Sequence, residues 1–95
     1  MKIFVRAVID GELILEEIEA TPVQGFEKCA IAHVSKNRWI VYDTPTGLLI
    51  VSGHTRKEAM ENLIDKRLQM HEARKTKLYE RRLQEFEELK NYDLC

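Results

Sequence analysis

The chain has 95 residues, of which 33% are charged and 44% are hydrophobic, and its formal net charge is −1. These values are typical of one globular domain, and they exclude a protein that binds nucleic acid or anionic membranes through its net charge alone. No apolar run exceeds four residues, which argues against a transmembrane helix and against a secretory leader.

Charge is unevenly distributed along the chain. Residues 1–27 carry a net charge of −4, residues 28–82 carry +6, and residues 83–95 carry −3. The two cysteines are Cys29, inside an apolar run, and Cys95 at the end of the sequence. A disulfide between them is not expected, and we therefore predict a reducing, cytoplasmic location (the host cytoplasm if a phage encodes the protein).

The first stretch, Lys2 to Thr21, predicts a β-hairpin. Asp10-Gly11 separates two runs rich in apolar residues, and an Asp-Gly pair favours the type I′ turn because both positions need positive φ. The alternation of apolar and polar residues along the second strand shifts by one position at Glu16-Glu17, which predicts a bulge there. Residues 21–25 contain Pro and Gly and read as a connecting loop.

Three further strands are expected at residues 26–34, 38–44 and 48–52. Polar turns of a few residues join them, at Ser35-Lys36-Asn37 and at Thr44-Pro45-Thr46-Gly47. Connections this short require an antiparallel meander. Together with the hairpin, the pattern predicts an antiparallel sheet of about five strands.

The remainder of the chain predicts helix. Thr55 and Glu58 form a capping box after Gly53, and no Gly or Pro follows. The apolar stripe thins between Asp65 and Lys77, so we expect two helical segments that meet near residues 74–76. The expected organisation is an α+β domain over residues 1–75 and a C-terminal helical extension over residues 76–95.

That extension carries an apolar seam for which the expected sheet offers no obvious place. We predict that this seam forms a dimer contact or another assembly surface. Its residues are Tyr79, Leu83, Phe86 and Leu89.

No catalytic constellation is apparent. The three histidines, His33, His54 and His71, lie outside any metal motif, and the four glycines are scattered rather than gathered in a phosphate-binding loop. Cys29 is expected to be a small buried side chain. We therefore expect a protein that is not an enzyme and that holds no metal and no cofactor.

A basic stretch of the expected helices offers one functional hypothesis. Paired bases recur there at seven or eight residues, which could track phosphates, and Trp39 could stack on a base. The alternative for these residues is an ordinary solvated helix face. The candidate nucleic-acid contacts are Trp39, Lys66, Arg67, Arg74, Lys75, Arg81 and Arg82.

The run from Phe26 to about Leu68 resembles the partial ribonuclease-H-like core of HicB-type antitoxins. The resemblance rests on three short strands followed by Gly53, Thr55, Glu58, Ala59 and Asn62. It implies a non-catalytic protein that inhibits a nuclease toxin. The pattern is also similar to small phage and prophage proteins, for which the resemblance implies modulation of a host or defence protein.

Acidic residues of the first hairpin suit that function, because a nuclease presents a basic groove that negative side chains can occupy. The favoured hypothesis is therefore a protein that binds and inhibits a protein partner. Nucleic-acid binding and a purely structural oligomerisation module are the alternatives. The candidate partner-binding residues are Glu12, Glu16, Glu17 and Glu19.

Overall fold

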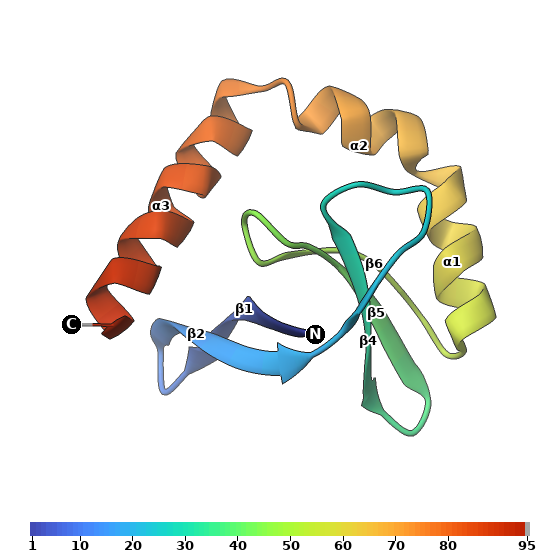
Figure 1. Ribbon diagram of the computed structural model, residues 1–95, viewed down its shortest axis with the longest axis horizontal. Coiled ribbons are helices and arrows are strands. Elements are labelled where there is room, and N and C mark those ends of the chain that lie inside the picture. Colours follow the sequence, from blue (N-terminus) through green and yellow to red (C-terminus); the bar gives the residue numbers. More distant parts are fainter. Residues whose placement is uncertain (95) are drawn as a thin grey trace.

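The computed structural model describes residues 1–94 and confirms the α+β fold, with two antiparallel sheets and three helices (Figure 1). No described helix has the length and apolar character needed to cross a membrane. The strands are β1 (Lys2–Ile9), β2 (Glu12–Glu19), β3 (Thr21–Pro22), β4 (Cys29–Ser35), β5 (Arg38–Asp43) and β6 (Leu48–Gly53). The helices are α1 (Arg56–Asp65), α2 (Arg67–Ala73) and α3 (Lys77–Leu94).

The first hairpin forms as the sequence predicts. Asp10 and Gly11 both have positive φ, 52° and 83°, as a type I′ turn requires. The predicted bulge at Glu16-Glu17 is wrong, because the pairing of β1 with β2 is unbroken from Lys2↔Glu19 to Ile9↔Glu12. The alternation of apolar and polar residues slips for a different reason. One face of the hairpin packs on the second sheet and the other faces α3, so both faces carry apolar residues.

The second sheet has the strand order β3-β4-β5-β6. Its meander matches the prediction, whereas β3 is a short added strand where a loop was expected. The hairpin forms a separate sheet that packs across one face of this sheet, where Ile3 and Val5 join Ala30, Ile40 and Tyr42 in a buried cluster. The opposite face carries a second cluster, which α1 and α2 cover.

Helix α1 begins with the Thr55 cap that the sequence predicts, which is one of the two bonds of the predicted capping box. The Thr55 side chain accepts a hydrogen bond from the Glu58 backbone nitrogen at 3.0 Å. The buried Ala59 and Leu63 then pack on the sheet. At Gly53, a Cβ would lie 2.5 Å from the Ala59 nitrogen, so glycine is needed where the strand meets the helix.

Two breaks divide the helical part of the chain. The break between α2 and α3 lies where the sequence predicts it, and Thr76 marks it by donating to the Ala73 carbonyl and accepting from the Tyr79 nitrogen. The break at Lys66 was not predicted. It bends the chain so that Met70 of α2 joins the same buried cluster as Leu63, and the three helices form an arc around the strands (Figure 1).

Helix α3 lies against the other face of the hairpin. Phe86 is only 4% exposed, and its ring lies so close to Gly47 that a Cβ there would meet its Cε2 atom at 2.9 Å. Arg6 of β1 forms an ion pair with Glu85 at 3.1 Å. The expectation that the apolar seam has no place on this chain is therefore wrong for Phe86, because the hairpin and the β5–β6 turn already cover it.

Candidate partner-binding surface

The four acidic residues predicted to bind a partner are all exposed on β2. Since side chains alternate along a strand, Glu16 shares a face with Ile14 and Ile18, and Glu17 lies on the opposite face. The four carboxylates therefore surround the strand. They do not form a single acidic face.

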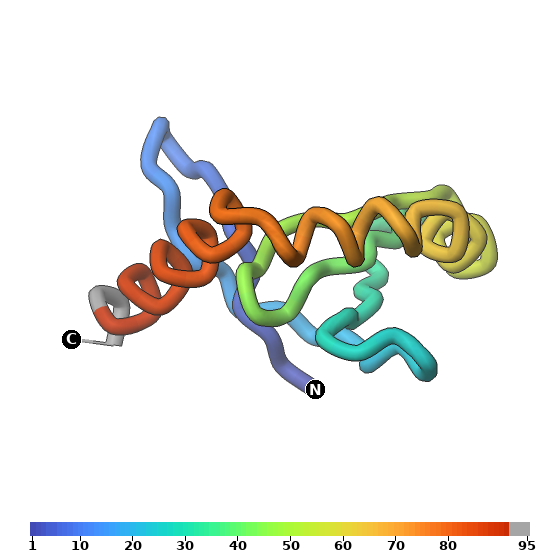
Figure 2. Tube along the Cα trace, turned by 90° about the horizontal axis from the view of Figure 1, so that it is seen from above, coloured from blue at the N-terminus to red at the C-terminus, as the bar shows by residue number. Residues whose placement is uncertain are grey.

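Apolar side chains lie exposed around the tip of this hairpin. Val8 is 71% exposed, Ile9 53% and Leu13 44%, beside the acidic Asp10 and Glu12. Figure 2 shows the tip rising out of the layer in which the helices lie. Val8 and Leu13 lie opposite each other on one face of the hairpin, and Ile9 lies on the other face. Exposed apolar side chains next to each other and rimmed by polar residues are candidates for an interaction surface.

The two basic residues of the hairpin, Lys2 and Arg6, do not neutralise the negative charge of its surface. Lys2 pairs with Glu17 at 3.4 Å in an exposed contact, which is worth little in water. Arg6 is directed inward, where it donates to Glu85, to the Arg82 carbonyl and to the Thr46 carbonyl. The outward charge of the hairpin is therefore negative.

A cleft of about 630 Å³ lies between the hairpin and strands β4 and β5. Glu16 lines it from the hairpin and Arg38 from the sheet, and apolar residues such as Ile18 and Ile40 also line it. Tyr42 is only 9% exposed and lines this cleft. Among the hydrogen bonds of the described residues, none involves the Tyr42 hydroxyl, and burial raises its pKa.

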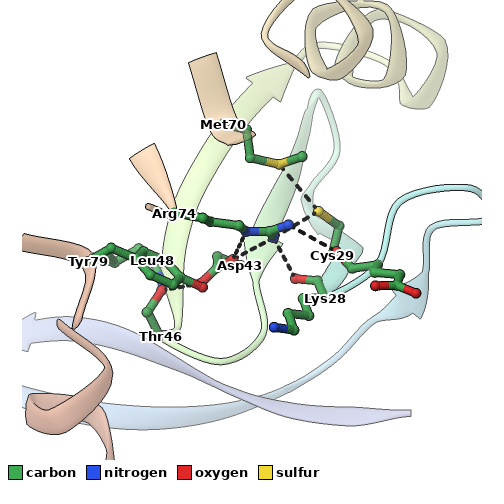
Figure 3. Close-up of polar contacts among 9 residues, drawn as sticks. Lys28, Cys29, Asp43, Thr46, Leu48, Met70, Arg74 and Tyr79 are labelled. Atoms are coloured by element: carbon green, nitrogen blue, oxygen red, sulfur yellow. Dashed lines mark hydrogen bonds and ion pairs between the residues drawn. The ribbon is translucent and has the colours of Figure 1, made fainter. Parts of the chain in front are cut away.

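The Asp43 carboxylate, at the end of β5, accepts four hydrogen bonds from side chains of three other residues (Figure 3). Asp43 is 4% exposed. One oxygen accepts from Arg74 Nη2 at 2.6 Å and from Arg74 Nε at 3.1 Å. The other accepts from the Thr46 hydroxyl at 2.6 Å and from the Tyr79 hydroxyl at 2.8 Å. These four bonds join the β5–β6 turn to the end of α2 and the start of α3.

Arg74 also binds the chain between β3 and β4. It donates to the Glu27 and Lys28 carbonyls at 3.2 and 3.3 Å and lies 3.5 Å from the Cys29 sulfur. Cys29 is buried and unpaired, and burial raises its pKa; Cys95 lies outside the described residues. Among the described residues, no buried polar side-chain atom of this cluster lacks a hydrogen-bond partner, and its bonds join α2 and α3 to the sheet.

Burial and the Asp43 carboxylate raise the pKa of Tyr79 to about 12. The folded state thus holds this proton more tightly than the unfolded state, whose tyrosine pKa is about 10. The resulting stabilisation is complete below pH 10 and is lost as pH rises toward 12. We expect a phenolate titration followed by absorbance to lose its latest step in Tyr79→Phe. An unchanged late step in that variant would contradict this assignment.

The predicted nucleic-acid residues lie in different surroundings. The guanidinium of Arg74 is committed to Asp43, so its assignment as a phosphate contact is wrong. Arg82 pairs with Glu85 at 2.8 Å and Lys75 with Glu72 at 3.9 Å. Two further groups are in aromatic contacts: Arg67 lies over Phe26, and Trp39 stacks on His33 with ring centroids 4.2 Å apart. Lys66 and Arg81 are exposed.

The predicted oligomer seam is divided between the interior and the surface. Phe86 is buried within the chain, and Tyr79 is bonded to Asp43. Leu83 and Leu89 are partly exposed, and Leu89 lines a shallow hollow with Leu13. The prediction that Phe86 contributes to an oligomer interface is therefore wrong, because its side chain is buried within the chain. The predictions for Tyr79, Leu83 and Leu89, which are partly exposed, stay predictions.

The residues that carry the HicB resemblance all serve the junction between β6 and α1. Gly53 allows the close approach to Ala59, Thr55 caps the helix, and the Asn62 side chain donates to the Ser52 carbonyl at 2.8 Å. Comparisons with protein-family models, with curated proteins and with solved structures found no match. Within residues 1–94, no three metal-binding side chains are grouped in a way that could hold an ion. The resemblance stays a prediction.

Proposed function

We propose that this protein binds a protein partner through the hairpin β1–β2 and inhibits it by covering its functional surface. The observation that carries the proposal is the exposed hairpin tip, where Val8, Ile9 and Leu13 lie among acidic residues. A partner with a basic groove complements this surface in charge, and the apolar tip supplies area to bury.

The partner of this chemistry is a nucleic-acid-processing protein, whose substrate groove is basic. Acidic side chains that enter such a groove take the place of phosphates and exclude the substrate. The Asp43 cluster is not part of the proposed surface, because its carboxylate accepts four hydrogen bonds from within the fold.

The test is affinity capture from the native lysate with the wild-type chain and with Glu16, Glu17 and Glu19 changed to Lys. We expect the hairpin variant to lose the captured partner while its circular dichroism spectrum is unchanged, because all three side chains are exposed. The matched control makes the same change of charge on the helices, at Glu61, Glu72 and Glu87, and should retain the partner. Equal capture by all three baits would reject the proposal.

A further inference from the structure

The two edges of the hairpin differ in their backbone hydrogen bonds. Ala20 exchanges both of its backbone bonds with Met1, each at 2.8 Å. In an antiparallel pair such residues alternate with residues whose N–H and C=O point away from the partner strand. The even-numbered residues of β2 therefore bond to β1. The odd-numbered residues, Leu13, Leu15, Glu17 and Glu19, direct their backbone groups to the outer edge.

The outer edge of β1 is bonded to the β5–β6 turn at its middle residue Arg6, whereas the outer edge of β2 is open along its length. Arg6 of β1 donates its N–H to the Gly47 carbonyl at 3.1 Å. Among the described residues, no backbone hydrogen bond is made by the odd-numbered residues of β2. Thr21, the next odd-numbered residue, pairs with Ile31 of β4. The same edge of the chain is therefore already paired with a strand just beyond the end of β2.

The outer edge of β2 has no neighbouring strand because the two sheets separate at Ala20. Continuing the β3–β4 register would pair Glu19 with His33, but the observed pairing ends at Thr21↔Ile31. Beyond that point lies the cleft lined by Glu16, Arg38 and Tyr42. The Tyr42 side chain lines this cleft, and its hydroxyl, which has no hydrogen-bond partner among the described residues, is not fully buried.

We propose that β2 binds an extended segment of the partner as a third strand of the hairpin. The segment pairs with the outward backbone groups of the odd-numbered residues, and its Lys or Arg side chains lie beside Glu16, on the face of β2 that borders the cleft. Charge identifies the occupant: a second copy of this acidic edge would place like charges opposite each other, which disfavours self-pairing. The Tyr42 hydroxyl supplies one more hydrogen bond in the cleft.

This inference rests on the proposed function and adds the mode of binding. Its probe is a synthetic peptide in which Lys alternates with Val, with Thr at both ends. Amide hydrogen exchange of the full chain should show Leu13, Leu15, Glu17 and Glu19 becoming protected when this peptide is added at millimolar concentration. A peptide with Glu in place of Lys should give no protection. Protection of none of these four amides by the Lys peptide would overturn the proposal.

A matched pair of variants tests the backbone contact. Glu17→Ala and Glu17→Pro both remove the carboxylate, but only the proline also removes the outward N–H, and proline is tolerated at the outer edge of a strand. We expect Glu17→Pro to bind the Lys peptide about tenfold more weakly than Glu17→Ala, in line with the loss of one backbone hydrogen bond. Equal affinities of two folded variants would overturn strand addition.

The two proposals fail in different ways. If the lysine triple variant of the hairpin loses the captured partner while Glu17→Pro and Glu17→Ala capture it equally, the hairpin binds by its side chains and strand addition is wrong. If the triple variant captures as well as the wild type, the proposed function itself fails.

Discussion

Replacing Asp43 with Ala is expected to lower the free energy of unfolding by about 3–5 kcal/mol, the range found when one partner of a buried ion pair is removed. The change leaves the partly buried guanidinium of Arg74 without its carboxylate and the Tyr79 hydroxyl without its acceptor. It also frees the β5–β6 turn, since Thr46 loses its bond. Urea unfolding followed by circular dichroism measures the loss.

Two variants control this measurement. Glu72→Ala breaks the exposed pair with Lys75 and should cost less than about 1 kcal/mol. The double variant Asp43→Ala, Arg74→Met removes both buried charges and should recover a large part of the stability lost in the single variant. A single variant as stable as Glu72→Ala would show that the cluster does not hold α2 and α3 to the sheet.

The second large effect is expected at Phe86. Phe86→Ala removes a side chain that is 4% exposed and should lower the free energy of unfolding by about 3 kcal/mol or more, as for other buried aromatic residues. Leu78→Ala, at an exposed position in the first turn of the same helix, is the control and should leave stability nearly unchanged.

This pair of variants also separates packing within the chain from assembly. If Phe86 served only an oligomer contact, its loss would reduce the molecular mass in solution and leave the protomer as stable as before. Light scattering combined with the unfolding curve decides between these outcomes. A lower mass with an unchanged midpoint would contradict the position of α3 described above.

Features that depend on neighbouring residues were predictable from the sequence. The Asp10-Gly11 turn, the Thr55 cap and the helix break near residues 74–76 each depend on a few adjacent residues. The pairing of Asp43 with Arg74 joins residues 31 positions apart. Only the three-dimensional arrangement brings them together, so the sequence suggested a phosphate contact for Arg74.

The candidate surface was predictable in composition but not in shape. The acidic residues of β2 are exposed as expected. The exposure of Val8 and Ile9 was not foreseen, because an apolar strand gives no sign of the point at which it extends beyond the core. The outward backbone groups of β2 have no partner strand because the two sheets separate at Ala20. The pattern of side chains in the sequence does not predict where two sheets separate.

The most direct test of the central claim is capture from the native lysate by the wild-type chain, with and without nuclease treatment. A protein partner bound through the acidic hairpin should be retained equally in both samples. Capture that disappears after nuclease treatment would contradict the proposal and would indicate binding through nucleic acid, with exposed bases such as Lys66 and Arg81 as its contacts.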